Sequence, residues 1–364
     1  MSRLPNRKEA IEAARSQGLK IAAVLPFHYP RALLRAHGFH PVEIWGPPHV
    51  DDMTGTPHFP EYTCKIVQKA TTFLLSPAAD CVDLVLMPHT CDSLQGMASV
   101  FQEFLSYPKP VLTLYHPRGR RNSDRKFLEA ELRILSQQLS KISGMEESGL
   151  GRKLEEEMAA EDQATALMAQ MLDQRDKFAV TDREFYTCLR SREYLPPHDF
   201  LEGAKALPRG KAEQPGVGIM ISGILPEPME IFDHINAFGA HVVADDLACV
   251  GRRCYPTDPM REKREEDPFV RLARQYTAMP ADSTVSTPFR ERFSALTRTM
   301  EDRGARAMLV YNTKFCEPEL FYLPMLKQAI QEKKFGFLEI EMELDDKLSQ
   351  TVLNRINAFI EVIS

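Results

Sequence analysis

The chain has 364 residues and a net charge of -6, with 43% hydrophobic and 26% charged residues. This composition is typical of a soluble globular protein, and the length fits two domains plus an insertion. The acidic balance offers no basic surface to a polyanion, and no zinc-finger or RNA-binding motif occurs, so we expect no nucleic-acid partner.

The N-terminal segment and the cysteines indicate a compartment. Residues 1–22 are interspersed with charged side chains and lack the apolar region of a secretory signal. No apolar run approaches the ~18 residues of a membrane-spanning helix, so we expect no membrane association. Seven cysteines, an odd number over a long chain, argue against a disulfide framework and predict a reducing, cytoplasmic location.

The first third of the chain alternates strand-like and helix-like segments. Short apolar runs bounded by turn residues predict buried parallel strands, and the segments between them have helical character. The expected strands are Ile21–Pro26, Pro41–Trp45, Val82–Met87 and Val111–Tyr115, and the expected helices are Tyr29–Ala36 and Ser93–Leu105. This βαβα order predicts an α/β lobe.

The middle of the chain differs in composition. Residues 125–178 are rich in Glu, Lys, Gln, Leu and Met at helical spacing, which predicts an inserted helical region. The segment Leu195–Gln214 contains three prolines and is expected to be a linker. We therefore divide the chain into a first α/β lobe (1–124), a helical insertion with linker (125–215) and a second α/β lobe (216–364).

After Gly216 the pattern of the first lobe returns. The expected strands are Gly218–Ser222, His241–Ala244, Ala307–Tyr311 and Phe337–Glu341, and the expected helices are Glu230–Phe238 and Glu319–Lys333. The two halves therefore read as a duplicated architecture.

Two cysteines occupy equivalent places in these halves. Cys91 follows the third strand of the first half, and Cys316 follows the third strand of the second. The next strand begins 111-91=20 residues after Cys91 and 337-316=21 residues after Cys316. Open α/β sheets bind ligands beyond the carboxyl ends of their strands, and a helix N-terminus lowers a thiol pKa. Buried core thiols are the alternative interpretation.

Several common chemistries have no motif here. The chain lacks a Gly-x4-Gly-Lys-Ser/Thr phosphate loop, a Gly-x-Ser-x-Gly elbow and a His-Glu-x-x-His pair. Gly216, Gly218 and Gly223 open a predicted strand instead of following one, so we reject a dinucleotide-binding fingerprint. Iron-sulfur clusters can take thiolates from separate segments, and Cys64, which precedes the third strand, could fold back as a third ligand.

The order of several strings resembles the 2-hydroxyacyl-CoA dehydratase and benzoyl-CoA reductase superfamily over nearly the whole chain. The strings are His37–Gly46, Pro88–Asp92, Asp245–Leu247, Lys314–Pro318 and the tail Gln350–Glu361. The resemblance implies two flavodoxin- or Rossmann-like lobes with parallel sheets and a helical insertion. It also implies that Cys64, Cys91 and Cys316 bind a 4Fe-4S cluster between the lobes.

The same resemblance implies partners and a reaction. A separate ATP-hydrolysing iron-sulfur activator would supply one low-potential electron, and a related second subunit would complete a heterodimer. The electron would reduce an acyl-CoA or aryl-CoA thioester to a ketyl radical anion, which leads to dehydration or to ring reduction. The missing phosphate loop fits a separate activator.

Residues near the expected ligands are candidates for acid-base chemistry. His89 and His28 are possible proton donors, and Glu43 is a weak candidate for substrate contact because it ends a strand. Asp92 and Glu317 follow their cysteines at helix starts, where the helix dipole alone explains an acidic residue. Arg118, Arg120 and Arg121 could bind CoA phosphates or an activator, or could be solvated surface charges.

Two other functions stay open. The chain could be an electron-transfer subunit of the same kind of complex that never binds substrate. Alternatively it could be a double-cubane reductase of small molecules, with Cys249 or Cys254 as additional ligands. The acyl group would be selected by variable loops around residues 50–58 and by the helical insertion.

Overall fold

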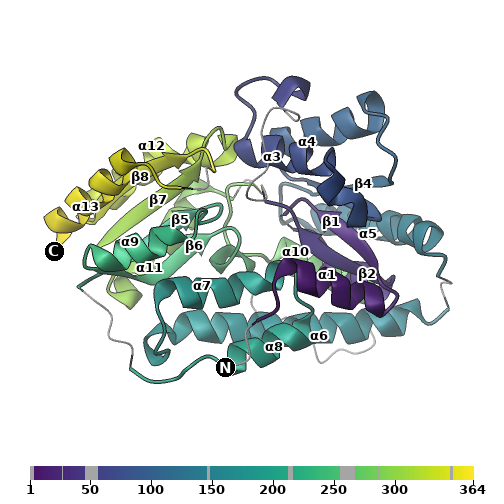
Figure 1. Cartoon of the computed structure of the whole chain (residues 1–364), viewed down its shortest axis with the longest axis horizontal. Coiled ribbons are helices and arrows are strands. Elements are labelled where there is room, and N and C mark those ends of the chain that lie inside the picture. Colours follow the sequence, from purple (N-terminus) through teal and green to yellow (C-terminus); the bar gives the residue numbers. More distant parts are fainter. Residues whose placement is uncertain are drawn as a thin grey trace.

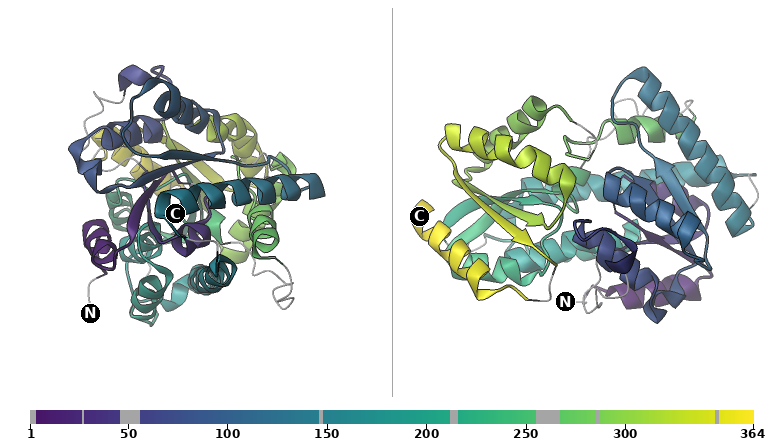
Figure 2. Two further views of the ribbon diagram at one scale, coloured as in Figure 1. Left: turned by 90° about the vertical axis from the view of Figure 1, so that its right-hand side faces the viewer. Right: turned by 90° about the horizontal axis from the view of Figure 1, so that it is seen from above.

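A computed structural model describes residues 4–26, 28–45, 56–145, 148–211, 216–254, 267–284, 287–344 and 347–364. Two parallel four-stranded sheets, each covered by helices, lie side by side, and long helices run beneath both (Figures 1 and 2). The expected two-lobed α/β fold is therefore confirmed. Most of the expected loop at 50–58 lies outside the described residues.

The first sheet has the strand order β2-β1-β3-β4. Its strands are β1 (Lys20–Val24), β2 (Phe39–Glu43), β3 (Leu84–His89) and β4 (Val111–Tyr115). Its helices are α2 (Arg31–Ala36), α3 (Lys65–Leu74) and α4 (Asp92–Ser99), and α4 continues into a π-helical turn, η3 (Val100–Phe104). The four predicted strands are confirmed, with ends shifted by up to two residues.

The second sheet repeats this arrangement in the order β6-β5-β7-β8. Its strands are β5 (Val217–Gly223), β6 (Ala240–Leu247), β7 (Ala307–Thr313) and β8 (Gly336–Met342). Its helices are α9 (Glu230–Ala237), α11 (Phe289–Arg303), α12 (Glu317–Glu332) and α13 (Gln350–Ile363). Because β5 to β8 take the same relative order as β1 to β4, the duplication predicted from the sequence is confirmed.

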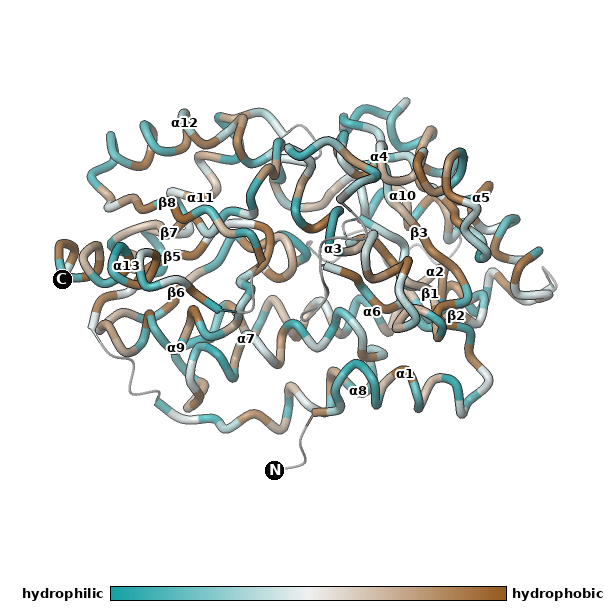
Figure 3. The backbone as a smooth tube through the Cα atoms, turned by 45° about the horizontal axis from the view of Figure 1, so that its top comes forward, coloured by the Kyte–Doolittle hydropathy of each residue, from teal (hydrophilic) through white to brown (hydrophobic). Residues whose placement is uncertain are grey.

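Helices on both faces bury the strands, which explains their continuous apolar runs. In β1, Ala22 and Val24 pack with α2 and α5 (Asn122–Ser143), whereas Ala23 packs with α3 and α4. Figure 3 shows hydrophobic colouring along the strands and hydrophilic colouring on much of the outer helices.

The long helix α6 (Leu150–Asp173) joins the two lobes. Its first half places Leu154 and Met158 in the core that includes β1 and β3, and its second half places Met168 and Met171 in the core of the second sheet. Helix α10 (Pro268–Thr277) lies in the range 216–364 but packs on α5 and α6 through Leu272 and Ala273. The helical insertion is therefore a shared support for both lobes.

The expectation of a linker at Leu195–Gln214 is wrong in part, because α8 (Pro197–Lys205) occupies much of this segment and buries Phe200. The N-terminal helix α1 (Arg7–Ser16) was not expected, and neither was α7 (Asp182–Arg190). Both begin with capping boxes, Asn6 with Glu9 and Thr181 with Glu184, so local signals for both were present.

None of the helices in the described parts of the chain is both long enough and apolar enough to cross a membrane.

Candidate functional site

Three cysteines each occupy the N-cap of a helix. Cys64 precedes α3, Cys91 precedes α4 and Cys316 precedes α12. Cys91 and Cys316 also follow β3 and β7, the third strands of their sheets. Cys64 therefore lies at a helix start instead of on a loop folded over the sheet edge.

Contacts between the two lobes bring these segments together. The backbone N–H of Lys65 donates to the carbonyl of Lys314 at 3.3 Å, which joins the Cys64 segment to the Cys316 segment. The side chains of Lys65 and Lys314 both pair with Glu343. The start of α3 consequently lies beside the start of α12 (Figure 1).

The three thiols influence one another. A hydrogen bond between the Cys64 and Cys316 thiols lowers the pKa of Cys64 and raises that of Cys316, because the pair releases its first proton more easily than its second. Backbone N–H groups of Ile66 and Val67 also lower the pKa of Cys64. Burial raises the pKa of Cys91 to about 12, with a smaller contribution from the charge of Cys64. The three thiols are therefore close enough to influence one another, with Cys64 and Cys316 buried and Cys91 partly exposed.

A cavity of about 170 Å³ adjoins this group on the Cys91 side. Its lining comes from both lobes and includes Cys91, Arg118, Ser283 and Glu317. Thr90 also lines it, and its buried hydroxyl has no hydrogen-bond partner among the described residues. A polar group in the cavity could satisfy this hydroxyl.

The predicted proton donors lie near the carboxyl edge of the first sheet. His89 ends β3, and its ring makes an edge contact with Tyr115, at 5.0 Å between ring centroids. His28 is buried, and its Nε2 lies 3.5 Å from the hydroxyl oxygen of Thr284. Burial lowers the pKa of His28 and lowers that of its neighbour His116 to about 3, so both rings are neutral near pH 7.

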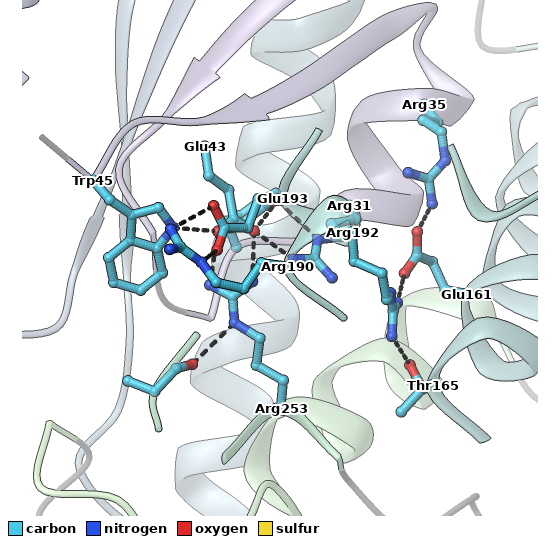
Figure 4. Close-up of polar contacts among 12 residues, drawn as sticks. Arg31, Arg35, Glu43, Trp45, Glu161, Thr165, Arg190, Arg192, Glu193 and Arg253 are labelled. Atoms are coloured by element: carbon cyan, nitrogen blue, oxygen red, sulfur yellow. Dashed lines mark hydrogen bonds and ion pairs between the residues drawn. The ribbon is translucent and has the colours of Figure 1, made fainter. Parts of the chain in front are cut away.

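Glu43 is placed differently from the expectation of a substrate contact. Its carboxylate is buried and bound to four side chains of the protein (Figure 4). Tyr29 and Trp45 donate at 2.8 and 2.7 Å, Arg253 donates to both oxygens at 2.7 and 2.8 Å, and Arg31 also donates. Burial alone would raise the pKa of Glu43, but Arg253 and Arg31 hold it well below its usual value.

A second buried ionic cluster surrounds Arg252. This arginine donates to Asp246 at 3.0 Å, to Glu319 at 2.6 Å and to Asp282 at 3.2 Å. Arg292 donates to the same Asp246 and Glu319. Glu319 belongs to the first turn of α12, three residues after Cys316. The cluster therefore anchors the helix start that carries this thiol.

The sequence did not point to these arginines. Glu43 ends β2 and Asp246 lies near the end of β6, the equivalent strand of the second lobe. Acidic residues at equivalent strand ends were a readable signal, and Arg252 follows Asp246 by only six residues, whereas Arg253 lies 210 residues from its partner Glu43. Figure 4 shows a further pair of contacts, in which Glu161 of α6 accepts from Arg35 and Arg192.

The three arginines after β4 all have acidic partners. Arg118 lies 3.8 Å from Asp92, Arg120 pairs with Glu291 at 2.7 Å, and Arg121 pairs with Asp124. Apart from Asp124, which is buried, the side chains of these pairs are largely exposed, so the pairs act mainly as surface charges.

The other cysteines have different surroundings from Cys64, Cys91 and Cys316. Cys188 and Cys249 are buried, and burial raises the pKa of Cys254 to about 12. The principal charged neighbours of Cys249 and Cys254 are arginines and carboxylates, and Cys81 packs at the edge of the first lobe.

Cys64, Cys91 and Cys316 are the residues that could hold a cofactor. Within the described ranges, no three His, Cys, Asp or Glu side chains converge closely enough for one metal ion. In a cubane cluster each thiolate binds a different iron, so convergence on a point is not required. Three thiols at helix N-termini suit a group of net negative charge.

Comparison with known proteins decides the family. The family model described as "2-hydroxyglutaryl-CoA dehydratase, D-component" matches residues 26–363. The chain belongs to this D-component family.

Individual relatives of this D-component protein cover nearly the same length. It is 25% identical to lactoyl-CoA dehydratase subunit beta of Anaerotignum propionicum, over 98% of this chain and 96% of the relative. It is 23% identical to the (R)-phenyllactyl-CoA dehydratase beta subunit of Clostridium sporogenes, over 98% and 95%. It is 21% identical to one subunit of the benzoyl-CoA reductase of Thauera aromatica, over 94% and 91%. All three relatives are named as subunits of enzymes.

Proposed function

We propose that this chain is the iron-sulfur subunit of a 2-hydroxyacyl-CoA dehydratase or aryl-CoA reductase, and that Cys64, Cys91 and Cys316 bind its 4Fe-4S cluster. One observation carries the proposal: three cysteines stand at the N-caps of three helices, with the Cys64 segment bonded to the Cys316 segment and with Cys91 and Glu317 lining one cavity. The relatives support the substrate class, since their names specify lactoyl-CoA, phenyllactyl-CoA and benzoyl-CoA.

The protein around the thiols suits this role. Cys64 and Cys316 are 8% and 7% exposed, so the site excludes most water and strengthens electrostatic interactions. Backbone N–H groups in the first turns of α3 and α4 favour the thiolate forms of Cys64 and Cys91. When bound, the cluster would supply an electron path and one iron without a cysteine ligand.

The cavity beside Cys91 is the proposed place for the thioester carbonyl. Thr90 offers an unpartnered hydroxyl there, and Ser283 contributes a wall from the opposite side. We retain His89 as the candidate proton donor because it ends the strand that leads to Cys91. Glu43 is instead proposed to position the lobes, because protein donors occupy both of its oxygens.

The proposal includes two protein partners. A separate ATP-hydrolysing iron-sulfur activator would deliver the electron, since this chain has no phosphate loop of its own. A related second subunit would complete a heterodimer, in agreement with the subunit names of the relatives.

A second function, electron relay without substrate binding, is favoured by the size of the cavity. About 170 Å³ lies below the 300–1,000 Å³ that is typical of small-molecule sites. In that case the substrate would bind to the partner subunit, and this chain would pass the electron on.

Anaerobic reconstitution with iron and sulfide tests the proposal. We expect about four irons per chain, and a clear loss of iron in Cys64→Ser, Cys91→Ser and Cys316→Ser. Cys81→Ser is the matched control and should keep the full iron content. Retention of iron by Cys64→Ser would remove that residue from the ligand set, and about eight irons would indicate a double-cubane protein instead.

Electron paramagnetic resonance of the reduced, reconstituted chain separates the two functions. An acyl-CoA that changes the spectrum of the cluster would support substrate binding at this subunit. An unchanged spectrum, with a change seen only in the partner subunit, would support electron relay.

A further inference from the structure

The thiols of Cys64 and Cys316 form a pair that joins the two lobes. They are hydrogen-bonded to each other although 316-64=252 positions separate them in the sequence. Both side chains belong to one continuous buried cluster, whereas Cys91 packs against a different cluster, on the face of the first sheet that α3 and α4 cover. The structure thus sets these two thiols apart from the third.

The backbone holds this pair in place. The N–H of Lys65 donates to the carbonyl of Lys314 at 3.3 Å, and this bond joins the residue after Cys64 to the residue two before Cys316. The N–H of Cys316 donates to the carbonyl of Thr313 at 3.0 Å, which fixes the turn before α12. Because both segments are held together by main-chain atoms, we expect rotation of the two side chains to bring their sulfur atoms into bonding contact without a movement of the lobes.

The surroundings of the pair suit oxidation by a small molecule. Cys64 and Cys316 are 8% and 7% exposed, so bulky oxidants cannot reach their sulfur atoms, whereas hydrogen peroxide is scarcely larger than water. Backbone N–H groups of Ile66 and Val67 favour the thiolate of Cys64, which is the form that attacks a peroxide. The pair therefore combines restricted access with a reactive sulfur.

A second thiol decides the product of such an oxidation. A thiolate that is oxidised alone passes from the sulfenic acid to the sulfinic acid, whereas a neighbouring thiol diverts the sulfenic acid into a reversible disulfide. Cys316 is that neighbour for Cys64. The same disulfide results if Cys316 reacts first, so the product does not depend on which of the two thiols is ionised.

We propose that Cys64 and Cys316 form a reversible disulfide between the lobes when the iron-free chain meets hydrogen peroxide. The sulfur of Cys64 attacks one peroxide oxygen, the O–O bond breaks, and a sulfenic acid and water result. The sulfur of Cys316 then attacks the sulfur of Cys64, the S–S bond forms, and the hydroxyl of the sulfenic acid leaves as water with the proton of Cys316. Two electrons pass from the thiols to the peroxide, which is reduced to water.

The disulfide would control loading with iron, a consequence that rests on the proposed function. Iron binds thiolates, and a disulfide sulfur is not a thiolate, so two of the three proposed ligands are withdrawn together. A dithiol reductant returns both thiols by exchange and becomes a disulfide itself. The oxidised chain should therefore take up iron and sulfide several-fold more slowly than the reduced chain, and pretreatment with dithiothreitol should abolish the difference.

The thiol chemistry is tested on the full chain without iron. After treatment of the reduced chain with hydrogen peroxide, the thiols counted in denaturant should fall from seven to 7-2=5, and dithiothreitol should restore them. Trypsin places each member of the pair in a peptide with a single cysteine, residues 36–65 and residues 315–327, and places Cys91 in residues 70–118. Mass spectrometry without reductant should find residues 36–65 linked to residues 315–327.

Matched variants assign the pair, with circular dichroism used to check that each keeps its fold. Cys64→Ser and Cys316→Ser should each lose the linked peptides, whereas Cys91→Ser and Cys81→Ser should form them as the wild type does. Loss of thiols without linked peptides, or a link from residues 70–118 to either member of the pair, would overturn the proposal. Equal iron uptake by the oxidised and reduced chains would overturn its role in loading. Failure of the reduced chain to bind iron would count against the proposed function alone, because the disulfide is measured without iron.

Discussion

Arg253 and Glu43 form a two-point ion pair that joins the lobes across 210 positions of sequence, at 2.7 and 2.8 Å. The neighbouring Arg252 binds Asp246 at two points as well, at 3.0 Å for both contacts. Two consecutive arginines thus bind the acidic residues at equivalent strand ends of the two sheets. This short turn fixes the spacing of the lobes between which the three cysteines lie.

Arg253→Met should lower the free energy of unfolding by about 3 kcal/mol, because removal of one partner of a buried pair leaves the other less compensated. Arg31 still binds Glu43, which places the loss at the lower end of the usual range. Urea unfolding followed by the emission of Trp45 provides the measurement, since the Trp45 indole donates to Glu43.

Arg152→Met is the control for this prediction, because Arg152 and Glu156 form an exposed pair. Its effect should stay within about 0.5 kcal/mol. Equal losses in the two variants would show that the ion pair between the lobes contributes no special stability.

Gly223→Ala should destabilise the second sheet strongly. Gly223 ends β5 with a φ of 143°, and an added Cβ would lie 2.1 Å from the carbonyl oxygen of Tyr311 on the adjacent β7. Backbone atoms on a central strand cannot move away without breaking the parallel pairing, so we expect a loss of more than about 3 kcal/mol.

Gly96→Ala serves as the counterpart, because a Cβ at Gly96 in α4 would meet no atom within 4 Å. Alanine is the better helix former, so this variant should gain up to about 1 kcal/mol. Thermal unfolding of both variants tests the pair, and a tolerated Gly223→Ala would contradict the close approach of β5 to β7.

The sequence predicted the parts of the structure that depend on local patterns. Apolar runs located the eight strands seen in the described residues, and the repeated spacing after Cys91 and Cys316 located two thiols at equivalent strand ends. Cys64 rested mainly on family resemblance, since its contact with Cys316 joins segments of different lobes. The contact between Glu43 and Arg253 was equally invisible, because periodicity carries no information about partners 210 residues apart.

Local composition was misleading in one segment. Pro196, Pro197 and Pro208 suggested a linker, but prolines are compatible with the first turn of a helix, and α8 begins at Pro197. Phe200 and Ala204 are both buried and lie four residues apart, which is the spacing of one helix face. This spacing was a local signal for α8 despite the prolines.

His37 should make the protein sensitive to moderate acid. Burial lowers its pKa to about 4, and one ring nitrogen lies 2.9 Å from the hydroxyl oxygen of Ser136 on α5. An unfolded chain has an imidazole pKa near 6.5, so protons bind the unfolded state first. The stabilisation is complete above about pH 6.5 and is lost as the pH falls toward 4.

His37→Gln removes this titration. Between pH 7 and 4.5, the free energy of unfolding of the wild type should fall by about 2 to 3 kcal/mol more than that of the variant. Urea unfolding at a series of pH values measures the difference. His198→Gln, at an exposed position, should follow the wild type, and parallel curves for His37→Gln would exclude this histidine as the source.

Glu319→Gln tests whether the Arg252 cluster holds the start of α12. Burial alone would raise the pKa of Glu319, but Arg252 and Arg292 hold it well below its usual value, so the residue is ionised at neutral pH. Neutralising it leaves two buried arginines with fewer negative partners, and we expect a loss of about 3 kcal/mol. In the reconstituted protein, iron should also pass to a chelator several-fold faster, because Cys316 lies three residues earlier.

Glu317→Gln changes the same charge at an exposed position in the same helix turn and should cost only about 0.3 to 1 kcal/mol. Equal effects of the two substitutions on unfolding and on iron release would mean that the helix dipole, and not the buried cluster, stabilises this end of α12.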